Sequence, residues 1–456
     1  MEPEVADLNW RQLLSRRRLG TRADAPASAN RTDFERDYDR IVFSSAFRRL
    51  QDKTQVFPLG RNDYVRTRLT HSLEVASVGR SLGLLAGRHV LAQHPDLVQA
   101  GYAEADFGAI VAAAALAHDI GNPPFGHEGE GAMQSWFASS VPGRAILIRL
   151  AGAERLDFER FEGNAQGFRT LARLQLPDNP GGMQLCCATL GAMTKYPRSS
   201  SVAISCAAGQ SGRKHGFFEA DRDLFETLAE ELGLVRRAPG EAAWCRHPLA
   251  FLVEAADDLC YRVVDVEDGF RARQLRFDEI EPLLLEIVAE RSARERVRAI
   301  ATDEKKVEYL RARAIGVLID EVAAAFEAHA AAMLHGGFDR DLASLVPHAA
   351  ELEALRRLAE RRVYGSALAR EAGAPGVEVL GELLSAFVGV VNAAAEDPGT
   401  LSDRLRAVLD MIPDQFLADG RIPDADLYRR VLRITDYVAG MTDSFAVLTR
   451  QKLAAL

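Results

Sequence analysis

Three separated stretches of the sequence carry side chains that could bind one metal ion. These are the adjacent His118 and Asp119 in AAAALAHDIGNPP, His71 in RTRLTHSLEVA, and the pair Asp257 and Asp258 in EAADDLCYRV. Imidazoles and carboxylates form a mixed nitrogen and oxygen ligand set that suits Mn, Fe, Co, Ni or Zn and leaves positions for water and substrate. The pattern predicts one divalent metal centre that hydrolyses a phosphorylated substrate. The residues alone do not choose between the two downstream aspartates.

An isolated His-Asp dipeptide is more often structural, with a buried histidine and an aspartate that caps a helix. Adjacent side chains in mid-helix diverge by about 100°, so they do not normally share a ligand. Here the dipeptide is followed by Gly121, Asn122 and two prolines, which end the helix and let the geometry relax. Together with the other two stretches, this context favours the metal site.

A second pair, His127 and Glu130 in FGHEGE, has the spacing of neighbours on one helix face. A histidine held by a carboxylate beside a metal is a proton-transfer unit, typically contributing about 10² to 10⁴ in rate. Glu128 is a competing partner for the histidine. The alternative is a surface pair in a glycine-rich loop.

Basic residues at 61, 66 and 68 precede the helix that carries His71. Amide dipoles at a helix N-terminus also favour anions, so Arg61, Arg66 and Arg68 could bind phosphates. A solvated basic loop is an equally good interpretation. Lys195 and Tyr196, in LGAMTKYP, form a weaker candidate for phosphate binding.

Asp257, Tyr261 and Asp265 recur at four-residue spacing and therefore share one helix face over two turns. An apolar stripe lies beside them in the sequence pattern, which indicates a partly buried polar groove rather than a solvated face. Gln55, in RRLQDKTQVFP, is a neutral amide that could bind a sugar hydroxyl, although one amide is weak evidence.

Helical periodicity dominates the chain and predicts an all-α fold. Helices are expected at about 70–93, 106–119 with Asp106 as N-cap, 248–269, 279–296, 303–334, 349–371, 376–395 and 400–411. The clearest strand candidate is SVAIS at 201–205. Residues 1–275 are predicted to form a core with its motifs at about 69–265, and residues 276–456 a helical extension packed on it.

The composition narrows the class of protein. A chain of 456 residues with 48% hydrophobic and 27% charged residues is typical of a soluble globular protein, and a net charge of −9 argues against a generic nucleic-acid binder. The N-terminus lacks a hydrophobic signal core, and the most apolar stretch, 107–117, is too short to span a bilayer. Five cysteines without a CxxC pair favour a reducing compartment. These features predict a cytoplasmic protein without a membrane segment.

Taken together, the motifs resemble the deoxyguanosine triphosphate triphosphohydrolase (dGTPase) and dGTPase-like family of the HD-domain superfamily. The matching runs are FSSAFRRLQDKTQVFPLGRNDYVRTRLTHSLEVA, LAHDIGNPPFGHEGE, RFEGNAQGFRTLARL, LGAMTKYP, FLVEAADDLCYRVVDVEDG and DYVAGMTDSFAV. They cover roughly residues 37–270 and 436–447. The combination is far more specific than the His-Asp dipeptide alone.

The resemblance implies an all-α phosphohydrolase core and a role for each matching residue. The metal ligands would be His71, His118, Asp119 and, aligned from Tyr261 backwards, Asp257. The catalytic pair would be His127 and Glu130. Sugar contacts would come from Gln55, Tyr261 and Asp265, and triphosphate contacts from Arg68, Lys195 and Tyr196.

The implied activity is metal-dependent hydrolysis of a deoxynucleoside triphosphate (dNTP) to deoxynucleoside and tripolyphosphate. The divalent metal would be Mn, Mg, Fe, Co, Ni or Zn. Related enzymes form homo-oligomers, often hexamers, and some bind an allosteric nucleotide or single-stranded DNA. The alternatives are another HD phosphohydrolase, such as a nucleotidase or cyclic-nucleotide phosphodiesterase, and a catalytically silent nucleotide- or DNA-binding regulator.

Overall fold

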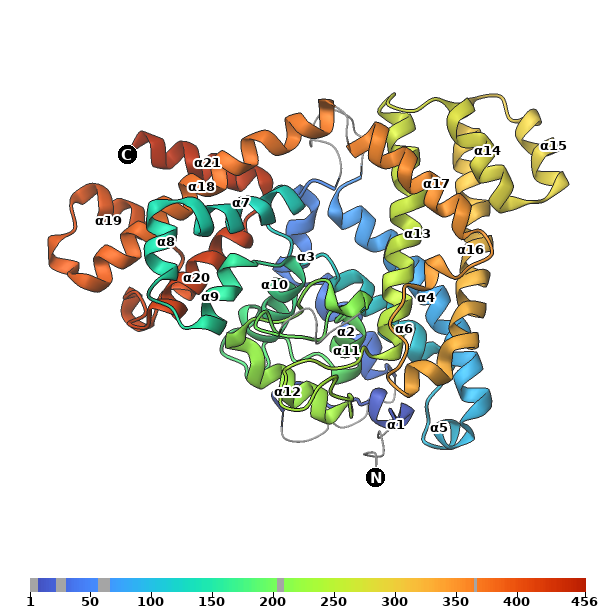
Figure 1. Cartoon of the computed structure of the whole chain (residues 1–456), viewed down its shortest axis with the longest axis horizontal. Helices are drawn as coiled ribbons and strands as arrows, with labels where there is room; N and C mark the ends of the chain where they lie inside the picture. Colours follow the sequence, from blue (N-terminus) through green and yellow to red (C-terminus); the bar gives the residue numbers. More distant parts are fainter. Residues whose placement is uncertain (1–6, 22–29, 56–65, 203–208, 365–366) are drawn as a thin grey trace.

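The computed structural model describes residues 7–21, 30–55, 66–202, 209–364 and 367–456, with the side chains of 367–375 and 400 left aside. Within these ranges the regular structure is helical, and β-pairing is confined to isolated bridges. The predicted all-α fold is confirmed. The molecule is elongated, with helical groups at both ends of a central body (Figure 1).

Three long helices form the central body that carries the candidate metal ligands: α4 (Arg68–Gln93), α6 (Glu104–Ala117) and α13 (Pro248–Arg271). Helix α6 is apolar on all sides, and every residue from Ile110 to Ala117 is buried. It packs so closely on α4 that a Cβ at Gly83 would lie 2.6 Å from the carbonyl oxygen of Phe107. Only glycine permits this approach of the two backbones.

One end of the molecule extends the hydrophobic core of the central body. Helices α14 (Phe277–Val288), α15 (Arg291–Ala299), α16 (Asp303–Leu334) and α17 (Ala349–Ala359) form this end. Helix α16 packs along α13, α14 and α4, and α17 packs on α13 (Figure 1). Their buried residues share one hydrophobic cluster with the central helices.

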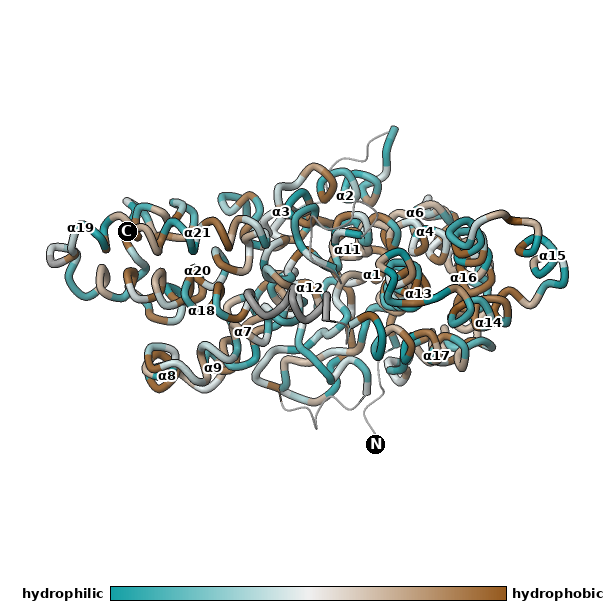
Figure 2. Tube along the Cα trace, turned by 90° about the horizontal axis from the view of Figure 1, so that it is seen from above, coloured by the Kyte–Doolittle hydropathy of each residue, from teal (hydrophilic) through white to brown (hydrophobic). Residues whose placement is uncertain are grey.

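The other end has a hydrophobic cluster of its own, built from two distant parts of the sequence. Helices α7 (Gly126–Ser139), α8 (Val141–Leu147) and α9 (Gly152–Glu159) meet the C-terminal helices α18 (Ala367–Glu396), α19 (Asp403–Asp410), α20 (Leu427–Ala439) and α21 (Asp443–Ala455). Both views place these two sets at the same end (Figures 1 and 2).

Helix α18 is the central helix of this second cluster. Its segment Gly376–Glu396 is long and apolar enough to cross a membrane, by length and composition alone. Half of the most apolar window is buried inside the protein, against α7, α20 and α21. Such burial is typical of the core helix of a folded domain.

Shorter helices complete the fold: α1 (Trp10–Leu13), α2 (Asp33–Val42), α3 (Ser45–Arg49), α5 (Pro95–Gln99), α10 (Gly163–Arg169), α11 (Cys187–Met193) and α12 (Arg222–Glu231). Single 3₁₀ turns lie at Leu50–Asp52, Gln210–Gly212, Glu219–Asp221, Leu342–Ser344, Pro398–Thr400, Asp414–Phe416 and Asp419–Arg421, and π-helical turns at Thr170–Leu174 and Glu360–Tyr364.

Several predicted element boundaries need correction. Asp106 is not the N-cap of α6 but lies in its first turn, where its carboxylate accepts the amide of Ala103 at 2.9 Å. The helix expected at 279–296 is two helices, because Ala289 takes a left-handed conformation with φ 53° between α14 and α15. Of the strand expected at 201–205, residues 201–202 lie in a turn and 203–205 fall outside the described residues.

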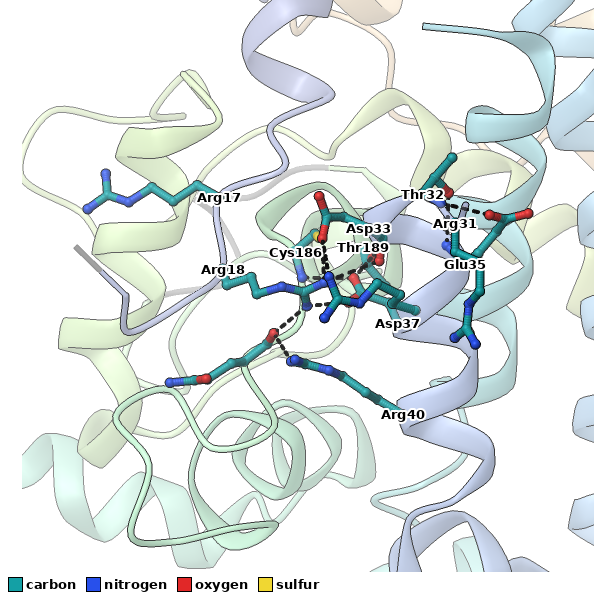
Figure 3. A network of polar contacts seen from close by, with 12 residues as sticks. Arg17, Arg18, Arg31, Thr32, Asp33, Glu35, Asp37, Arg40, Cys186 and Thr189 are labelled. Atoms are coloured by element: carbon teal, nitrogen blue, oxygen red, sulfur yellow. Dashed lines mark hydrogen bonds and ion pairs between the residues drawn. The ribbon is translucent and has the colours of Figure 1, made fainter. Parts of the chain in front are cut away.

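A buried ion-pair network joins the N-terminal segment to α2 and α11 (Figure 3). Arg18 donates to Asp37 Oδ1 at 2.7 Å and to Asp33 Oδ1 at 2.9 Å. The other oxygen of Asp37 accepts the Cys186 amide and the Thr189 hydroxyl, both at 2.8 Å. Asp37 is fully buried, so its carboxylate depends on three donor atoms, from Arg18, Cys186 and Thr189, in place of water.

Substitution of Asp37 is therefore expected to destabilise the fold. Asp37→Asn leaves the Arg18 guanidinium buried with a weaker set of acceptors, which should lower the free energy of unfolding by about 3–5 kcal/mol. Asp39→Asn is the matched control on the same helix, since the Asp39 ion pair with Arg31 is exposed and should contribute less than about 1 kcal/mol. Urea denaturation measures both, and equal effects would refute this assignment.

Candidate metal centre and substrate pocket

His71 reaches the centre of the molecule from the first turn of α4. The turn is fixed by a capping box in which the side chains of Thr67 and Thr70 each accept the other residue's amide. The imidazole is 1% exposed, and its Nε2 lies 3.2 Å from Asp257 Oδ1 on α13. Two helices far apart in the sequence thus place a histidine and a carboxylate face to face.

His118 and Asp119 directly follow the last residue of α6. His118 Nδ1 lies 2.6 Å from the carbonyl oxygen of Ala115 and donates to it, which leaves Nε2 as the nitrogen that faces the carboxylates. Nε2 lies 3.5 Å from Asp119 Oδ1 and 3.6 Å from Asp257 Oδ1. Because the helix has ended, the two adjacent side chains can turn toward one point.

These positions form a donor set that fits a divalent cation. Ligand atoms of His71, His118 and Asp119 all lie within 4.8 Å of one another, and Asp257 Oδ1 faces both imidazoles. Imidazole nitrogens and carboxylate oxygens that converge on one point are the donor types that bind divalent metals such as Mn, Fe, Co, Ni and Zn. The structure thus brings together all four side chains that the sequence analysis proposed as ligands.

The structure also separates the two adjacent aspartates of α13. Burial opposes ionisation of Asp257, but the neighbouring His118 and His71 outweigh it and lower its pKa. Asp258 instead accepts from Arg262 at 3.2 Å, and burial raises its pKa to about 7. Asp257 is therefore the aspartate that faces the imidazoles.

Asp119 is held by two further contacts. Arg68 donates to Oδ2 at 2.7 Å, and the Asn122 side chain donates to Oδ1 at 2.5 Å. Burial opposes the charge, yet Arg68 and the two histidines dominate and lower the pKa of Asp119. Hydrogen bonds of this kind orient a ligating carboxylate.

His127 and Glu130 lie on the first turn of α7 and contact each other. His127 Nδ1 is 3.0 Å from Glu130 Oε2, while Oε1 accepts the Gly163 amide at 2.8 Å. The His127 side chain is 78% exposed, whereas that of Glu130 is 8% exposed. A buried carboxylate therefore orients an accessible imidazole, and Glu128, which also lines the pocket, is not the partner.

Lys214 is a nearby cation that the sequence analysis did not single out. Its ammonium lies 2.9 Å from Glu162 and 3.7 Å from Glu130. It lies in the basic run GRKHG, between α11 and α12. The side chain is partly exposed, so it adds positive charge beside the His127–Glu130 pair.

A pocket of about 580 Å³ opens over the candidate metal centre. Its lining contains seven of the predicted site residues: Gln55, Arg68, His71, Asp119, His127, Asp257 and Tyr261. His118 and Glu130 are not part of the lining but contact residues that are: His118 contacts Asp119, and Glu130 contacts His127. A volume of this size is typical of small-molecule sites.

Asp265 lies behind the wall of the pocket. It is 1% exposed, and its Oδ2 accepts the hydroxyl of Tyr364. The Tyr364 ring stacks on Tyr261, with 5.3 Å between ring centroids and 12° between planes. Tyr364, from the π-helical turn after α17, lines the pocket in place of Asp265. Nothing in the sequence around Tyr364 indicates that it would lie at this site.

Two other predicted phosphate contacts lie deeper or elsewhere. Lys195 Nζ is 3.3 Å from Glu254, and Tyr196 is 7% exposed, so neither lines the pocket. Arg66 pairs with Glu74, Glu267 and Asp268 in a buried cluster, which makes it structural rather than a phosphate ligand. Arg61 lies outside the described residues.

Comparison with known proteins agrees with this geometry. A model of the HD domain matches residues 68–174, and a model of the phosphohydrolase-associated domain matches residues 346–452. A dGTPase-like protein from Synechocystis sp. is 46% identical, over 98% of this chain and 100% of its own length. The chain belongs to the dGTPase-like family.

Other members of the dGTPase-like family also align end to end. A dGTPase-like protein from Pseudomonas aeruginosa is 40% identical over 96% of this chain and 97% of its own length. A protein from Klebsiella pneumoniae named dGTPase is 31% identical over 98% of both. The HD-domain match contains His71, His118, Asp119, His127 and Glu130, whereas Asp257 lies beyond it.

The two aspartates of α13 offer a matched test of the metal centre. Asp257→Asn removes a charged oxygen that faces both imidazoles, so we expect Mn²⁺ affinity to fall by at least about 10–100-fold. Asp258→Asn should leave the affinity within about twofold, because Arg262 holds that side chain away. Isothermal titration of metal-stripped protein measures both constants. Equal losses, or a loss only in Asp258→Asn, would contradict the assignment of Asp257.

Proposed function

We propose that this protein is a metal-dependent dNTP triphosphohydrolase that releases deoxynucleoside and tripolyphosphate. The single observation that carries the proposal is the convergence of His71, His118, Asp119 and Asp257 beneath a pocket with the His127–Glu130 pair at its rim. Membership in a family whose relatives carry dGTPase names supports a nucleotide as substrate.

The charge of the pocket supports a metal requirement. Its lining contains five carboxylates, Asp119, Glu128, Asp257, Asp258 and Glu360, against one guanidinium, that of Arg68. A polyphosphate would be repelled by this surface unless bound cations reversed the local charge. The divalent metal, among Mn, Mg, Fe, Co, Ni and Zn, would be held by His71, His118, Asp119 and Asp257, and it would act as a Lewis acid toward the scissile phosphate.

The opposite side of the pocket fits a deoxynucleoside. Tyr261 and Tyr364 present stacked rings, which suit a flat or partly apolar group. Gln55 Oε1 is buried and lacks a hydrogen-bond partner among the described residues, so it can accept from a sugar hydroxyl. Asp265 would act through the Tyr364 hydroxyl rather than by direct contact.

The cations around the pocket would neutralise the triphosphate. Arg68 lines the pocket and donates a hydrogen bond to one of the proposed metal ligands, Asp119. Lys195 and Tyr196 lie below the surface, where Lys195 stabilises the charges of Asp257 and Asp258 and could reach a phosphate after a side-chain movement. Preorganised positive charge of this kind stabilises the transition state of phosphoryl transfer.

In the proposed reaction, a water oxygen bonds to the α-phosphorus and the bond from that phosphorus to O5′ breaks. O5′ leaves with a proton as the deoxynucleoside hydroxyl. His127 is placed to transfer this proton, since Glu130 holds Nδ1 and leaves Nε2 facing solvent and pocket. Glu130 itself is buried, so its role is to orient the imidazole.

Two alternatives differ in their products. A nucleotidase would release orthophosphate, and a cyclic-nucleotide phosphodiesterase would open a cyclic phosphate. A catalytically silent regulator would bind nucleotide or DNA without turnover. Assembly as a homo-oligomer, an allosteric nucleotide or single-stranded DNA at a second site, and a cytoplasmic location remain predictions.

Product analysis tests the proposed function. Metal-loaded protein is incubated with each dNTP singly and with all four mixed, since a second nucleotide could be needed as activator, and phosphate products are separated by ion exchange. We expect tripolyphosphate, abolished by chelation and lowered about 10²–10⁴-fold by His127→Ala with unchanged metal content. Release of orthophosphate alone, or no turnover with any metal or mixture, would contradict the proposal.

A further inference from the structure

Asp443, which follows the turn between α20 and α21, accepts hydrogen bonds from two residues that line the pocket, Thr54 and Phe125. We propose that Asp443, at the start of α21, is a positioning residue that fixes the loop carrying His127. This inference rests on the proposed function for its kinetic consequence, but its structural part does not. It also gives a role to the motif DYVAGMTDSFAV, which the metal centre and the proton-transfer pair leave unexplained.

One carboxylate holds two walls of the pocket together. Asp443 Oδ1 accepts the amide of Phe125 at 2.9 Å, and Oδ2 accepts both the amide and the hydroxyl of Thr54, at 2.9 and 2.7 Å. Phe125 lies two residues before His127, and Thr54 directly precedes Gln55. Asp443 is 8% exposed, so water offers these donors little competition.

The loop before His127 needs such support because its backbone is strained. Phe125 has φ 64° and Gly126 has φ 59°, which places two successive residues in the left-handed region. A bulky aromatic residue seldom adopts this conformation, and it persists only where the surroundings enforce it. The bond to Asp443 fixes the Phe125 amide in the orientation that this conformation requires.

The ring of Phe125 is restrained from the same end of the molecule. It packs against the second hydrophobic cluster, where a Cβ at Gly376 of α18 would lie 2.6 Å from the ring. The C-terminal helices thus hold both the amide and the ring of Phe125. Since α7 begins one residue later, this contact sets the direction in which His127 leaves the loop.

A second tie joins the same turn to the metal side of the site. Lys53 is 2% exposed, and its ammonium donates to the carbonyl oxygens of Ala439, at 3.1 Å, and of Asn122. The Asn122 side chain in turn donates to Asp119. Asp443 and Lys53 therefore link the turn at 439–443 to both ends of the segment from Asp119 to His127.

The test compares Asp443→Asn with Ser444→Ala. The amide keeps the size of Asp443 but presents a donor to at least one N–H. Ser444, on the same turn of α21, is exposed, and its hydroxyl donates to Asp52 at 2.9 Å. We expect Asp443→Asn to lower kcat by about 10–100-fold, because small displacements of a catalytic group have effects of this size. Ser444→Ala should stay within about twofold of wild type. Metal content should change little in both, and the thermal midpoint should fall only in Asp443→Asn, since a buried donor left without an acceptor costs about 1–3 kcal/mol.

A double-mutant cycle with His127→Ala separates positioning from a general structural role. If Asp443 acts through His127, adding Asp443→Asn to His127→Ala should cost less than about twofold further. If the two losses multiply, the proposal is wrong. Should Asp443→Asn fail to fold, Thr54→Val serves instead: it removes one of the three bonds and should give a smaller non-additive loss.

Hydrogen exchange keeps the test independent of the proposed function. Amides at 123–128 should exchange at least about tenfold faster in Asp443→Asn than in Ser444→Ala, whatever the substrate. Unchanged exchange in this segment would overturn the inference. If the wild type hydrolyses no dNTP but Asp443→Asn still shows the faster exchange, the dNTP hydrolase proposal is wrong and the role of Asp443 in the loop stands.

Discussion

The close approach of Asp257 Oδ1 to two imidazoles is the constraint around which the central helices are arranged. It requires α4, α13 and the end of α6 to hold two imidazoles within 4 Å of one carboxylate, with little access to water. Tight packing provides the restraint, through Gly83 against Phe107 and an α6 that is buried on every side. The apolar interior of this protein therefore determines the geometry of its most polar site.

The chain surrounds this centre from both ends. Residues 277–359 extend the first hydrophobic cluster along α13, whereas the helices from 367 onward build the second cluster with α7, α8 and α9. Through these packings Tyr364 lines the pocket, and Asp443 holds its lining residues Thr54 and Phe125. The C-terminal half contributes few candidate ligands, yet it positions the walls against which a substrate would lie.

Sequence patterns predicted the all-α fold and most of the helices because helix formation depends on local spacing. The bounds of α16 agree at both ends, and the His-Asp dipeptide lies at a helix end as its glycine and prolines indicate. Long-range contacts could not be predicted from local sequence, because they depend on segments distant in the chain. Examples are the burial of Asp265 behind Tyr364, the pairing of Arg66 with three carboxylates, and the position of Lys214. The choice of Asp257 over Asp258 came from the resemblance and not from local chemistry, because both stand on the same turn of α13.

The hydrogen bonds from Thr54 to Asp443 span 389 residues of sequence. During synthesis on the ribosome, the first wall of the pocket emerges long before its partner exists, because Asp443 follows Thr54 by 389 residues. Contacts of such sequence separation form late in folding. A nascent or prematurely terminated chain would thus already hold the His-Asp dipeptide while lacking the hydrogen bonds that join the two walls of the pocket.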